Sequence, residues 1–384
     1  MKIKFDSLQQ VRSSFSNDSY LFFIRNNQFN KSIQILYFNR FQTQVNNLRE
    51  IQALKRLTPH PHIVNLEEVL YDQPSGRLAM VFELMDANLY DLISGRREHL
   101  DSEHVRSLGY QLFLALQYMH SKGIFHRDIK PENVLVDASG KHLKVADLGS
   151  CRSIHARAPM TEYIATRWYR SPECLLTDGH YGVEMDIWGA GCVIFEITAL
   201  FPLFPGADEV DQIHRIHKVI GTPNESVLNK LREKGSSKIN YNFQETKGVG
   251  LKHFIPHASS DCINLLEKTM IYDYEERIDA YDAVNHQYFS KLREYDDTYK
   301  EETPILPKDS KEKEAKTVDC ITSKNKISDP IRQNRHDNPG GQKAVVRQKI
   351  KLRPLKKTHE EPNIMVSERS IMFLCVFSIT NLTT

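Results

Sequence analysis

The stretch that most constrains this chain is H-R-D-I-K-P-E-N, which occupies residues 126–133. Within it, Lys130 follows Asp128 by two residues and Asn133 follows it by five. A second acidic residue, Asp147, comes fourteen residues after Asn133 in the triplet D-L-G, at the end of a predicted strand. An acidic residue that accepts a hydroxyl proton, a lysine beside the transferred group and two oxygen ligands for Mg²⁺ together serve phosphoryl transfer. We therefore predict Asp128, Lys130 and Asn133 as catalytic residues, with Asn133 and Asp147 as metal ligands.

Composition divides the 384-residue chain into three regions. Residues 1–42 are rich in Asn, Gln, Ser and Phe, residues 43–290 are dense in periodic apolar segments, and residues 291–384 are rich in Lys and Glu. Between Lys308 and Lys357 there are 15 Lys and Arg residues against 6 Asp and Glu. Such a segment buries too little apolar surface to offset its ordering entropy, so we predict a disordered basic tail. Its role is a solvated linker, a docking segment or a nuclear address, and composition favours the linker.

Apolar periodicity predicts the elements of the middle region. Residues 45–57 form the first expected helix, with apolar residues on one face: Val45, Leu48, Ile51, Leu54 and Leu57. Further helices are expected over residues 105–120, 186–200, 210–220 and 261–270. Strands are expected over residues 78–82, 134–136 and 143–145, and the last two flank a Ser-Gly pair that predicts a hairpin.

The run at residues 126–133, followed by D-L-G, resembles the signature of the eukaryotic protein kinases. Ser171-Pro172-Glu173 stands where that family has A-P-E, and Asp186 opens the helix that follows. Arg277 resembles the arginine that pairs with this glutamate, although a surface charge on an acidic turn is the alternative for it. A buried Asp–Arg pair would explain H-R-D alone, but eight matching positions followed by D-x-G argue against it.

This resemblance implies the bilobal protein kinase fold, of α+β class. A small N-lobe, to about residue 84, is expected to hold an incomplete β-sheet and one helix. A mainly helical C-lobe is expected over residues 85–290. Residues 1–42 then form a divergent N-terminal segment before a kinase domain at 43–290, and residues 291–384 form the tail.

Finer motifs resemble the branch that contains the mitogen-activated and cyclin-dependent kinases. These are T-R-W-Y-R at residues 166–170 and G-T-P at residues 221–223, and Lys130 is the serine/threonine version of its loop. The resemblance implies a serine/threonine protein kinase that uses ATP and Mg²⁺ and acts on protein substrates. In this branch Arg170 shapes the pocket for the residue after the acceptor, so we expect a preference for Ser/Thr-Pro.

The triplet Thr161-Glu162-Tyr163 resembles an activation motif of the mitogen-activated type. Phosphate on Thr161 and Tyr163 would add about −1.5 to −2 charge each. Arg127 and Arg170 are the expected partners, so phosphorylation by an upstream kinase, or autophosphorylation, would order this loop. An ordinary surface loop is the alternative.

The nucleotide side of the site is less complete. Phe82, Glu83 and Met85 follow a predicted buried strand, where the family presents its hinge to adenine; strand-end packing is the alternative for them. Glu50 resembles the glutamate that pairs with the nucleotide-binding lysine, which the family places 17 to 18 residues earlier. That position is Ser32 or Ile33. The nearest lysine, Lys31, is the candidate substitute for the nucleotide-binding lysine, and a solvated surface charge is the alternative for it.

The glycine-rich phosphate loop of the family is also missing. The first glycine of the chain is Gly76, and only glycine lets a backbone close over triphosphate oxygens without a Cβ clash. The chain is therefore either a kinase with an unusual nucleotide grip or a kinase-like binding module with impaired catalysis. Residues 1–42 could also come from an alternative exon or a wrongly assigned start.

The remaining features restrict the setting of the protein. A formal net charge of +2 gives no overall reason to expect nucleic acid or membrane binding, and a monomer is expected. The six cysteines form no C-x-x-C pair and fit neither a zinc site nor a disulfide framework. The N-terminus lacks the pattern of a secretion signal, and the apolar runs at residues 19–24 and 371–379 are too short to span a bilayer. We expect a cytoplasmic protein, and the resemblance adds the nucleus and the cilium as further locations.

Overall fold

The computed structural model describes residues 22–26, 31–37, 48–72, 77–156, 158–160, 167–235 and 240–294. Of residues 22–26, 31–37, 72 and 77 only the backbone is described. The T-E-Y triplet at residues 161–163 and the basic tail lie outside these ranges, and so do the predictions made for them.

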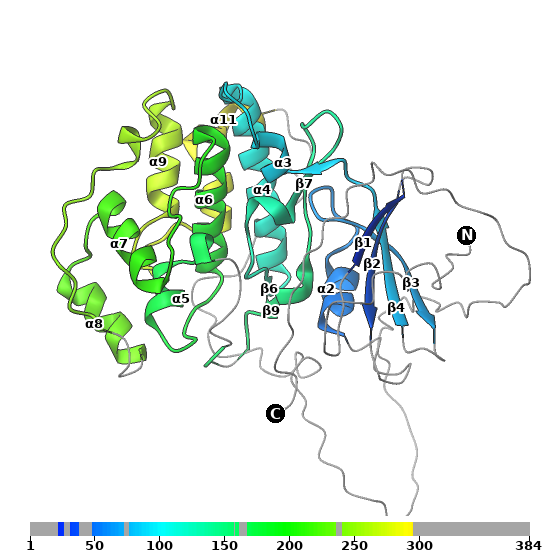
Figure 1. Ribbon diagram of the computed structural model, residues 1–384, viewed down its shortest axis with the longest axis horizontal. Coiled ribbons are helices and arrows are strands. Elements are labelled where there is room, and N and C mark those ends of the chain that lie inside the picture. Colours follow the sequence, from blue (N-terminus) through cyan, green and yellow to red (C-terminus); the bar gives the residue numbers. More distant parts are fainter. Residues whose placement is uncertain are drawn as a thin grey trace, which may run out of the picture.

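Figure 1 shows a smaller lobe of strands with one helix beside a larger, mainly helical lobe. In the described part of the small lobe, an antiparallel sheet has the strand order β1-β2-β4-β3. Its strands are β1 (Phe22–Asn26), β2 (Lys31–Tyr37), β3 (Leu66–Asp72) and β4 (Arg77–Glu83). β4 is buried at every position from Leu78 to Phe82, as expected for a buried strand, and Leu78, Met80 and Phe82 belong to the main hydrophobic core cluster.

The helix of the small lobe is α2 (Arg49–Leu57). As expected, Ile51, Leu54 and Leu57 are buried on one face. The predicted start at Val45 is wrong, because Leu48 has extended dihedral angles (φ −63°, ψ 129°) and precedes the first helical residue. Apolar spacing continues into a segment that is not helical at Leu48, and periodicity alone does not show where a helix begins.

The large lobe begins with short strands on either side of residues 126–133 and 147. β5 (Ala87–Asn88), β7 (Val134–Val136) and β8 (Leu143–Val145) form one antiparallel sheet, and β6 (Ile124–Phe125) pairs with β9 (Arg152–Ser153). β7 and β8 match the predicted strands and pair as the expected hairpin. The short 3-10 turn η2 (Pro131–Asn133) directly precedes β7, and η3 (Leu148–Ser150) lies between β8 and β9. A further 3-10 turn, η4 (Arg167–Tyr169), precedes α5 (Pro172–Leu176).

Helices make up most of the large lobe. They are α3 (Leu89–Ile93), α4 (Ser102–Ser121), α5 (Pro172–Leu176), α6 (Glu184–Ala199), α7 (Glu209–Ile220), α8 (Glu225–Lys234), α9 (Ser260–Thr269), α10 (Ala280–Val284) and α11 (Ser290–Arg293). Two further 3-10 turns are η5 (Leu251–His253) and η6 (Gln287–Phe289). Each of the four helices predicted in this lobe is present, with ends within three residues of those expected.

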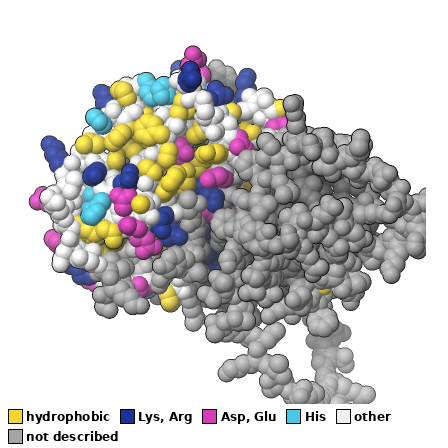
Figure 2. All heavy atoms as spheres, in the orientation of Figure 1, with side chains coloured by type: hydrophobic (Ala, Val, Ile, Leu, Met, Phe, Trp, Pro, Cys, Tyr) yellow, Lys and Arg dark blue, Asp and Glu magenta, His cyan; other side chains and the backbone are white. Residues whose placement is uncertain are grey.

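The central helix of the large lobe is α6, and it is buried along its whole length from Met185 to Ala199. It packs against α4 and α9. On the face seen in Figure 2, hydrophobic side chains gather over the helices of this lobe, with charged side chains around them. The bilobal α+β fold expected from the sequence is confirmed.

The described residues bear on two expectations, those about the cysteines and about membrane spans. Cys151, Cys174, Cys192 and Cys262 are free and buried. Within the described ranges, no helix is both long and apolar enough to cross a membrane.

Candidate active site

The predicted catalytic loop, residues 126–133, is held by the buried carboxylate of Asp186 on α6. The backbone N–H groups of His126 and Arg127 donate to Asp186 Oδ2 and Oδ1 at 2.7 and 2.8 Å. Arg127 has a φ of 74°, a conformation that costs of order 1–3 kcal/mol in a non-glycine residue and therefore needs such support. Burial acts to raise the pKa of Asp186, but the hydrogen bond from His120 Nε2 (2.9 Å) and the nearby imidazole and amide donors hold it below its ordinary value. Asp186 therefore acts as an anionic anchor for the loop.

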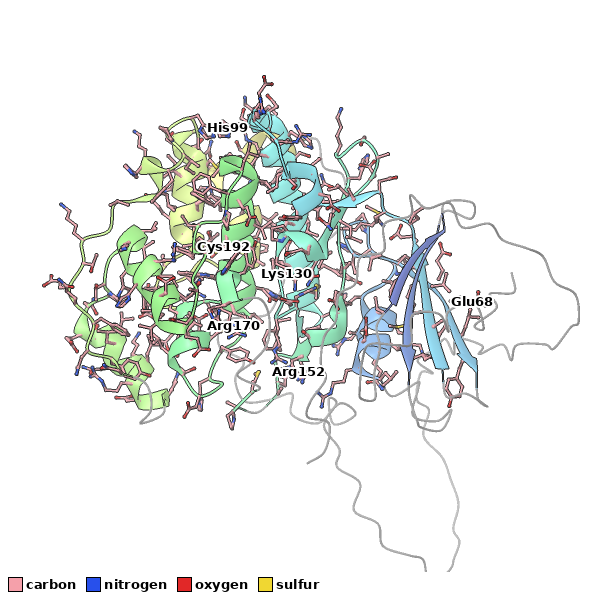
Figure 3. The ribbon with its side chains drawn as sticks, in the orientation of Figure 1. Glu68, His99, Lys130, Arg152, Arg170 and Cys192 are labelled. Atoms are coloured by element: carbon pink, nitrogen blue, oxygen red, sulfur yellow. The ribbon has the colours of Figure 1, made fainter. Side chains whose placement is uncertain are left out.

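The three predicted catalytic residues meet around one carboxylate. Lys130 Nζ lies 2.9 Å from Asp128 Oδ2, and Asn133 Nδ2 donates to the same oxygen at 2.9 Å. All three side chains are buried, and Figure 3 shows Lys130 in the part of the large lobe that faces the sheet. Asp128 Oδ1 is buried and has no hydrogen-bond partner among the described residues. One oxygen of Asp128 is thus fixed by its neighbours and the other is left to accept a proton.

Backbone pairing brings the second acidic residue to this cluster. Asn133 directly precedes β7, and Ala146 directly follows β8, the strand that pairs with it. Asn133 O accepts a 2.9 Å hydrogen bond from Ala146 N. His126 donates from Nε2 to Ala146 O (2.9 Å) and accepts at Nδ1 from Asp128 N (3.2 Å). Asp147 therefore follows a backbone position that is tied to both Asn133 and the catalytic loop.

Asp147 and Asn133 suit a magnesium ion. Asp147 has φ 61°, and burial together with the neighbouring Asp128 carboxylate raises its pKa, so a cation beside it would relieve an unfavourable charge. The Asn133 amide nitrogen is used by Asp128, which leaves its amide oxygen as a ligand. The described residues hold no cluster of three or more His, Cys, Asp and Glu side chains suited to a metal ion. One carboxylate and one amide nevertheless fit Mg²⁺, which in nucleotide sites keeps waters and phosphate oxygens as its other ligands.

A buried ion pair between Arg277 and Glu173 anchors the S-P-E triplet at the start of α5. Arg277 Nη1 and Nη2 donate to Glu173 Oε1 and Oε2 at 2.7 and 2.9 Å, and both side chains are fully buried. Arg277 also donates to Ile271 O and Glu184 O and lies over the Trp188 ring. The pair expected from the sequence is present, and the surface-charge alternative for Arg277 is wrong.

Comparison with known proteins agrees with this geometry. A family model described as "Protein kinase domain" matches residues 31–289, more than half of the chain. This chain belongs to the protein kinase family. It is 51% identical over 256 residues to the MAPK/MAK/MRK overlapping kinase of Homo sapiens, and 40% identical over 244 residues to the serine/threonine-protein kinase ICK of Mus musculus. It is 38% identical over 244 residues to the serine/threonine-protein kinase MAK of Homo sapiens.

These alignments cover only part of each kinase. They include 66% of this chain for the first relative and 63% for the other two. The chain spans about 60% of the length of the overlapping kinase and 38% of ICK and MAK. The kinase match begins at Lys31, inside the N-terminal segment that the sequence set apart.

The segment predicted as the hinge, Phe82 to Met85, lies at the end of β4 (Arg77–Glu83). Phe82 is buried in the core and ends the apolar face of the strand, so it also packs as a core residue. Glu83 Oε1 accepts from Asn65 N (2.7 Å) and lies 2.8 Å from Lys144 Nζ, which fixes the start of the hinge. In the described structure neither the N–H nor the C=O of Met85 takes part in a backbone hydrogen bond. Met85 can thus present both groups to the edge of a planar base.

The strand register bears on the missing kinase lysine. Lys31 is the cross-strand partner of Glu83, and Ile33 is that of Val81. Ser32 and Gln34 are instead the partners of Phe82 and Met80, which belong to the main hydrophobic core cluster. Because successive positions alternate between the two faces of a strand, Lys31 belongs to the face opposite Phe82. This register argues against Lys31 as the substitute for that lysine.

Glu50 lies near the D-L-G triplet, in which Asp147 is the predicted metal ligand. An added Cβ at Gly149 would lie 3.8 Å from Glu50 Oε2 and 3.2 Å from Asp147 Oδ1. Glu50 is also among the charges that raise the pKa of Cys151, after burial itself. The helix α2 thus places this carboxylate near the D-L-G triplet.

Three arginines gather near the start of the segment between Asp147 and Glu173, which we call the activation segment. Arg127 is buried, and its Nη2 donates to the Tyr181 hydroxyl at 2.6 Å. Burial, Arg127 and Arg49 lower the pKa of Arg152 to about 10, in that order of effect. The sequence did not single out Arg49 or Arg152. Their positions, next to Glu50 and five residues after Asp147, become informative only when the fold brings them together.

Each residue of the W-Y-R segment, residues 168–170, makes a side-chain hydrogen bond or ion pair. Trp168 Nε1 donates to Gly206 O at 3.1 Å, and the Tyr169 hydroxyl donates to the buried Glu196 Oε2 at 2.8 Å. Arg170 Nη1 lies 3.5 Å from Glu209 Oε1 on α7. Glu196 was also missed by the sequence, because a glutamate inside an apolar helix gives no signal of its partner.

Proposed function

We propose that this chain is a serine/threonine protein kinase, which transfers the γ-phosphoryl group of ATP to hydroxyl groups of proteins. The observation that carries the proposal is the environment of Asp128. Its Oδ2 is fixed by Lys130 and Asn133, whereas its Oδ1 is buried without a partner among the described residues. An acceptor hydroxyl at Oδ1 would be oriented and could give up its proton there.

The other residues position the reactants. Lys130 supports the transferred phosphate from within the same cluster, and Asn133 and Asp147 would hold Mg²⁺. ATP with Mg²⁺ supplies the phosphoryl group and neutralises its charge when bound. The hinge at Phe82–Met85 would receive the base, and Glu50 would align whichever cationic group meets the phosphates. Transfer then depends mainly on orientation and fixed charge, since these provide most of the catalysis in phosphoryl transfer.

Acceptor specificity tests this function. Three matched peptides would be assayed with the full chain, carrying Ser-Pro, Ser-Ala or Tyr-Pro at one position. We expect phosphate on serine, none on tyrosine, and a higher kcat/KM when proline follows. Equal transfer to tyrosine would rule out the serine/threonine class, and equal rates for Ser-Pro and Ser-Ala would rule out the proline preference.

We further propose that phosphorylation at Thr161 and Tyr163 activates the kinase. The arginines Arg49, Arg127 and Arg152 supply the positive charge that would receive a phosphate and order the segment. Alanine at Thr161 and Tyr163 should lower peptide phosphorylation by a chain first treated with an upstream kinase. Unchanged activity of that variant would contradict the switch.

A binding module with weak catalysis is the second candidate. The absence of any glycine before Gly76 and the register of Lys31 favour it, because both remove contacts that hold the triphosphate. Its test is the Mg-ATP affinity of the full chain beside a version that carries a complete glycine loop and lysine. Comparable affinities would exclude this candidate, and undetectable binding to the natural chain would establish it.

The proposed function implies partners for the enzyme, and we also propose a location in the cell. Protein substrates and an upstream kinase, or autophosphorylation, go with this function, and we propose the cytoplasm as its location, with the nucleus or cilium as alternatives. Fractionation of cells that express the tagged full chain tests the location.

A further inference from the structure

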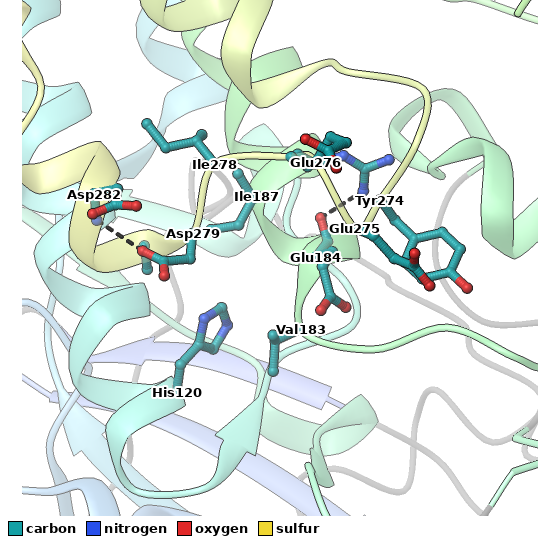
Figure 4. Close-up of a pocket in the computed structure, with 12 residues that line it drawn as sticks. His120, Val183, Glu184, Ile187, Tyr274, Glu275, Glu276, Ile278, Asp279 and Asp282 are labelled. Atoms are coloured by element: carbon teal, nitrogen blue, oxygen red, sulfur yellow. Dashed lines mark hydrogen bonds between the residues drawn. The ribbon is translucent and has the colours of Figure 1, made fainter. Parts of the chain in front are cut away.

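The large lobe contains a cavity of about 350 Å³ that the catalytic site does not use. It lies between the end of α4, the first turn of α6 and the loop that leads into α10 (Figure 4). Its volume is in the range of pockets that bind ligands in proteins. The cavity is therefore large enough to receive a side chain from another segment.

The walls of this cavity are acidic. Carboxylates from Glu184, Glu275, Glu276, Asp279 and Asp282 surround it in Figure 4. The one arginine in the lining, Arg277, is already paired with Glu173.

Few of these carboxylates are neutralised. Glu275 lies 3.0 Å from Lys230 Nζ, and Asp279 Oδ1 accepts the backbone N–H of Asp282 at 2.8 Å. Among the described residues, Glu184, Glu276 and the Asp282 side chain have no ion pair. Glu184 is also partly enclosed, and its burial raises the pKa of its carboxyl group. A ligand that enters this enclosed space must bring positive charge.

The cavity touches both anchors of the catalytic machinery. His120 lines it and donates from Nε2 to Asp186 (2.9 Å), the carboxylate that holds His126 and Arg127. On the other side, Arg277 donates to Glu184 O (2.8 Å) and pairs with Glu173 of the activation segment. A bound group would therefore contact the residues that fix both segments.

We propose that this acidic cavity binds the basic segment of the same chain, residues 343–357. That segment, K-A-V-V-R-Q-K-I-K-L-R-P-L-K-K, carries seven Lys and Arg residues and no Asp or Glu. Its charge is complementary to the cavity, whose carboxylates are mostly unpaired. The segment thereby couples the tail to the catalytic loop, and this regulatory consequence rests on the proposed kinase activity, whereas the binding does not.

The chain is long enough to reach. The described structure ends at Glu294, twelve residues after Asp282 of the cavity wall. The 48 residues between Glu294 and Lys343 would span roughly 35–40 Å on average if they were a flexible chain. A tether of this length gives a high effective concentration at a site near its starting point, so even exposed charge pairs suffice for occupancy.

Zero-length cross-linking of the full chain tests this binding without requiring catalysis. A carbodiimide joins lysines to carboxylates in contact, and peptide mapping of the monomer fraction locates the links. We expect links from the lysines of residues 343–357 to Glu184, Glu276 and Asp282. The double substitution Glu276→Lys, Asp282→Lys should reduce links to Glu184 by about threefold or more, as for the loss of two exposed charge pairs. The matched control Glu233→Lys, Glu267→Lys, on exposed positions of α8 and α9, should leave them unchanged.

A variant of the tail makes the test independent of the stability of the lobe. Replacing the seven basic residues of the segment by Gln should increase amide hydrogen exchange at residues 274–284. A synthetic peptide of residues 343–357, added to this variant, should restore protection. Links that fall equally on Glu233 and Glu267, links found only between two chains, or exchange unaffected by the tail variant would each overturn the proposal.

Discussion

At the scale of single residues, the chemistry depends on which atoms of a side chain are already engaged. Asp128 has one oxygen bound by Lys130 and Asn133 and one buried oxygen without a partner among the described residues. The sequence predicted these three residues from their spacing, because a short loop keeps residues two and five apart close together. It could not predict the proximity of Arg49 to Arg152, which depends on how α2 docks on the large lobe.

Glu196 allows a prediction about pH. Burial raises its pKa from 4.5 to about 7, the Tyr169 hydroxyl acts to lower it, and Glu132 acts to raise it further. A carboxyl group whose pKa is raised by folding binds a proton more tightly in the native state, so its contribution to stability is lost as pH rises from 4.5 to about 7. Glu196→Gln keeps an acceptor for Tyr169 but does not titrate.

We therefore expect the free energy of unfolding of the wild type to fall relative to Glu196→Gln over this interval, by up to about 3 kcal/mol. Urea denaturation of both proteins at a series of pH values measures the difference. Parallel stability profiles would show that Glu196 titrates normally.

At the scale of elements, the Glu173–Arg277 pair joins the start of α5 to the loop before α10. Breaking a fully buried pair leaves one uncompensated charge, which costs about 3–5 kcal/mol. We expect Arg277→Ala to lower the free energy of unfolding by that amount in urea denaturation. Lys230→Ala, which removes more exposed pairs to Asp273 and Glu275, should cost far less, because surface ion pairs contribute little to stability. Similar losses in the two variants would contradict the structural role of Arg277.

The register of β2 makes a second prediction at this scale. Gln34 shares a face with Met80 and Phe82, whereas Lys31 does not. Lys31→Met should therefore leave the Kd for Mg-ATP unchanged. Gln34→Lys should lower it about tenfold, as expected for one charge-assisted contact to phosphate. Equilibrium binding of a fluorescent ATP analogue measures both, and a clear loss in Lys31→Met would show that the register argument fails.

The elements also show what sequence patterns can predict. Strands β7 and β8 were located to the residue, because turn residues bound both ends of each short apolar run. The start of α2 was placed too early, because apolar spacing extends upstream of the first helical residue, Arg49. The strand β1 was not predicted, since its aromatic and polar residues lack both a clear alternation and the glycines that mark the first kinase strands.

At the scale of the whole molecule, the two lobes differ in how fully they match the kinase family. The large lobe contains the catalytic loop, its anchor Asp186 and the buried pair of the activation segment. The small lobe contains the sheet, the helix with Glu50 and the hinge, but Lys31 is on the opposite strand face from Phe82. The sequence alone shows that the glycines and the lysine are missing. Only the register of β2 against β4 shows that Gln34 is a position where a lysine would share the face of Phe82.

The most direct test of the account is phosphoryl transfer by the full chain to a Ser-Pro peptide, compared with its Asp128→Asn variant. We expect measurable transfer by the natural chain and a kcat lower by about 10²–10⁴-fold in the variant, with KM for the peptide little changed, because a side-chain amide at this position cannot accept the hydroxyl proton. Circular dichroism and thermal unfolding would establish that the variant is folded. Transfer by the natural chain that does not exceed that of Asp128→Asn would contradict the account.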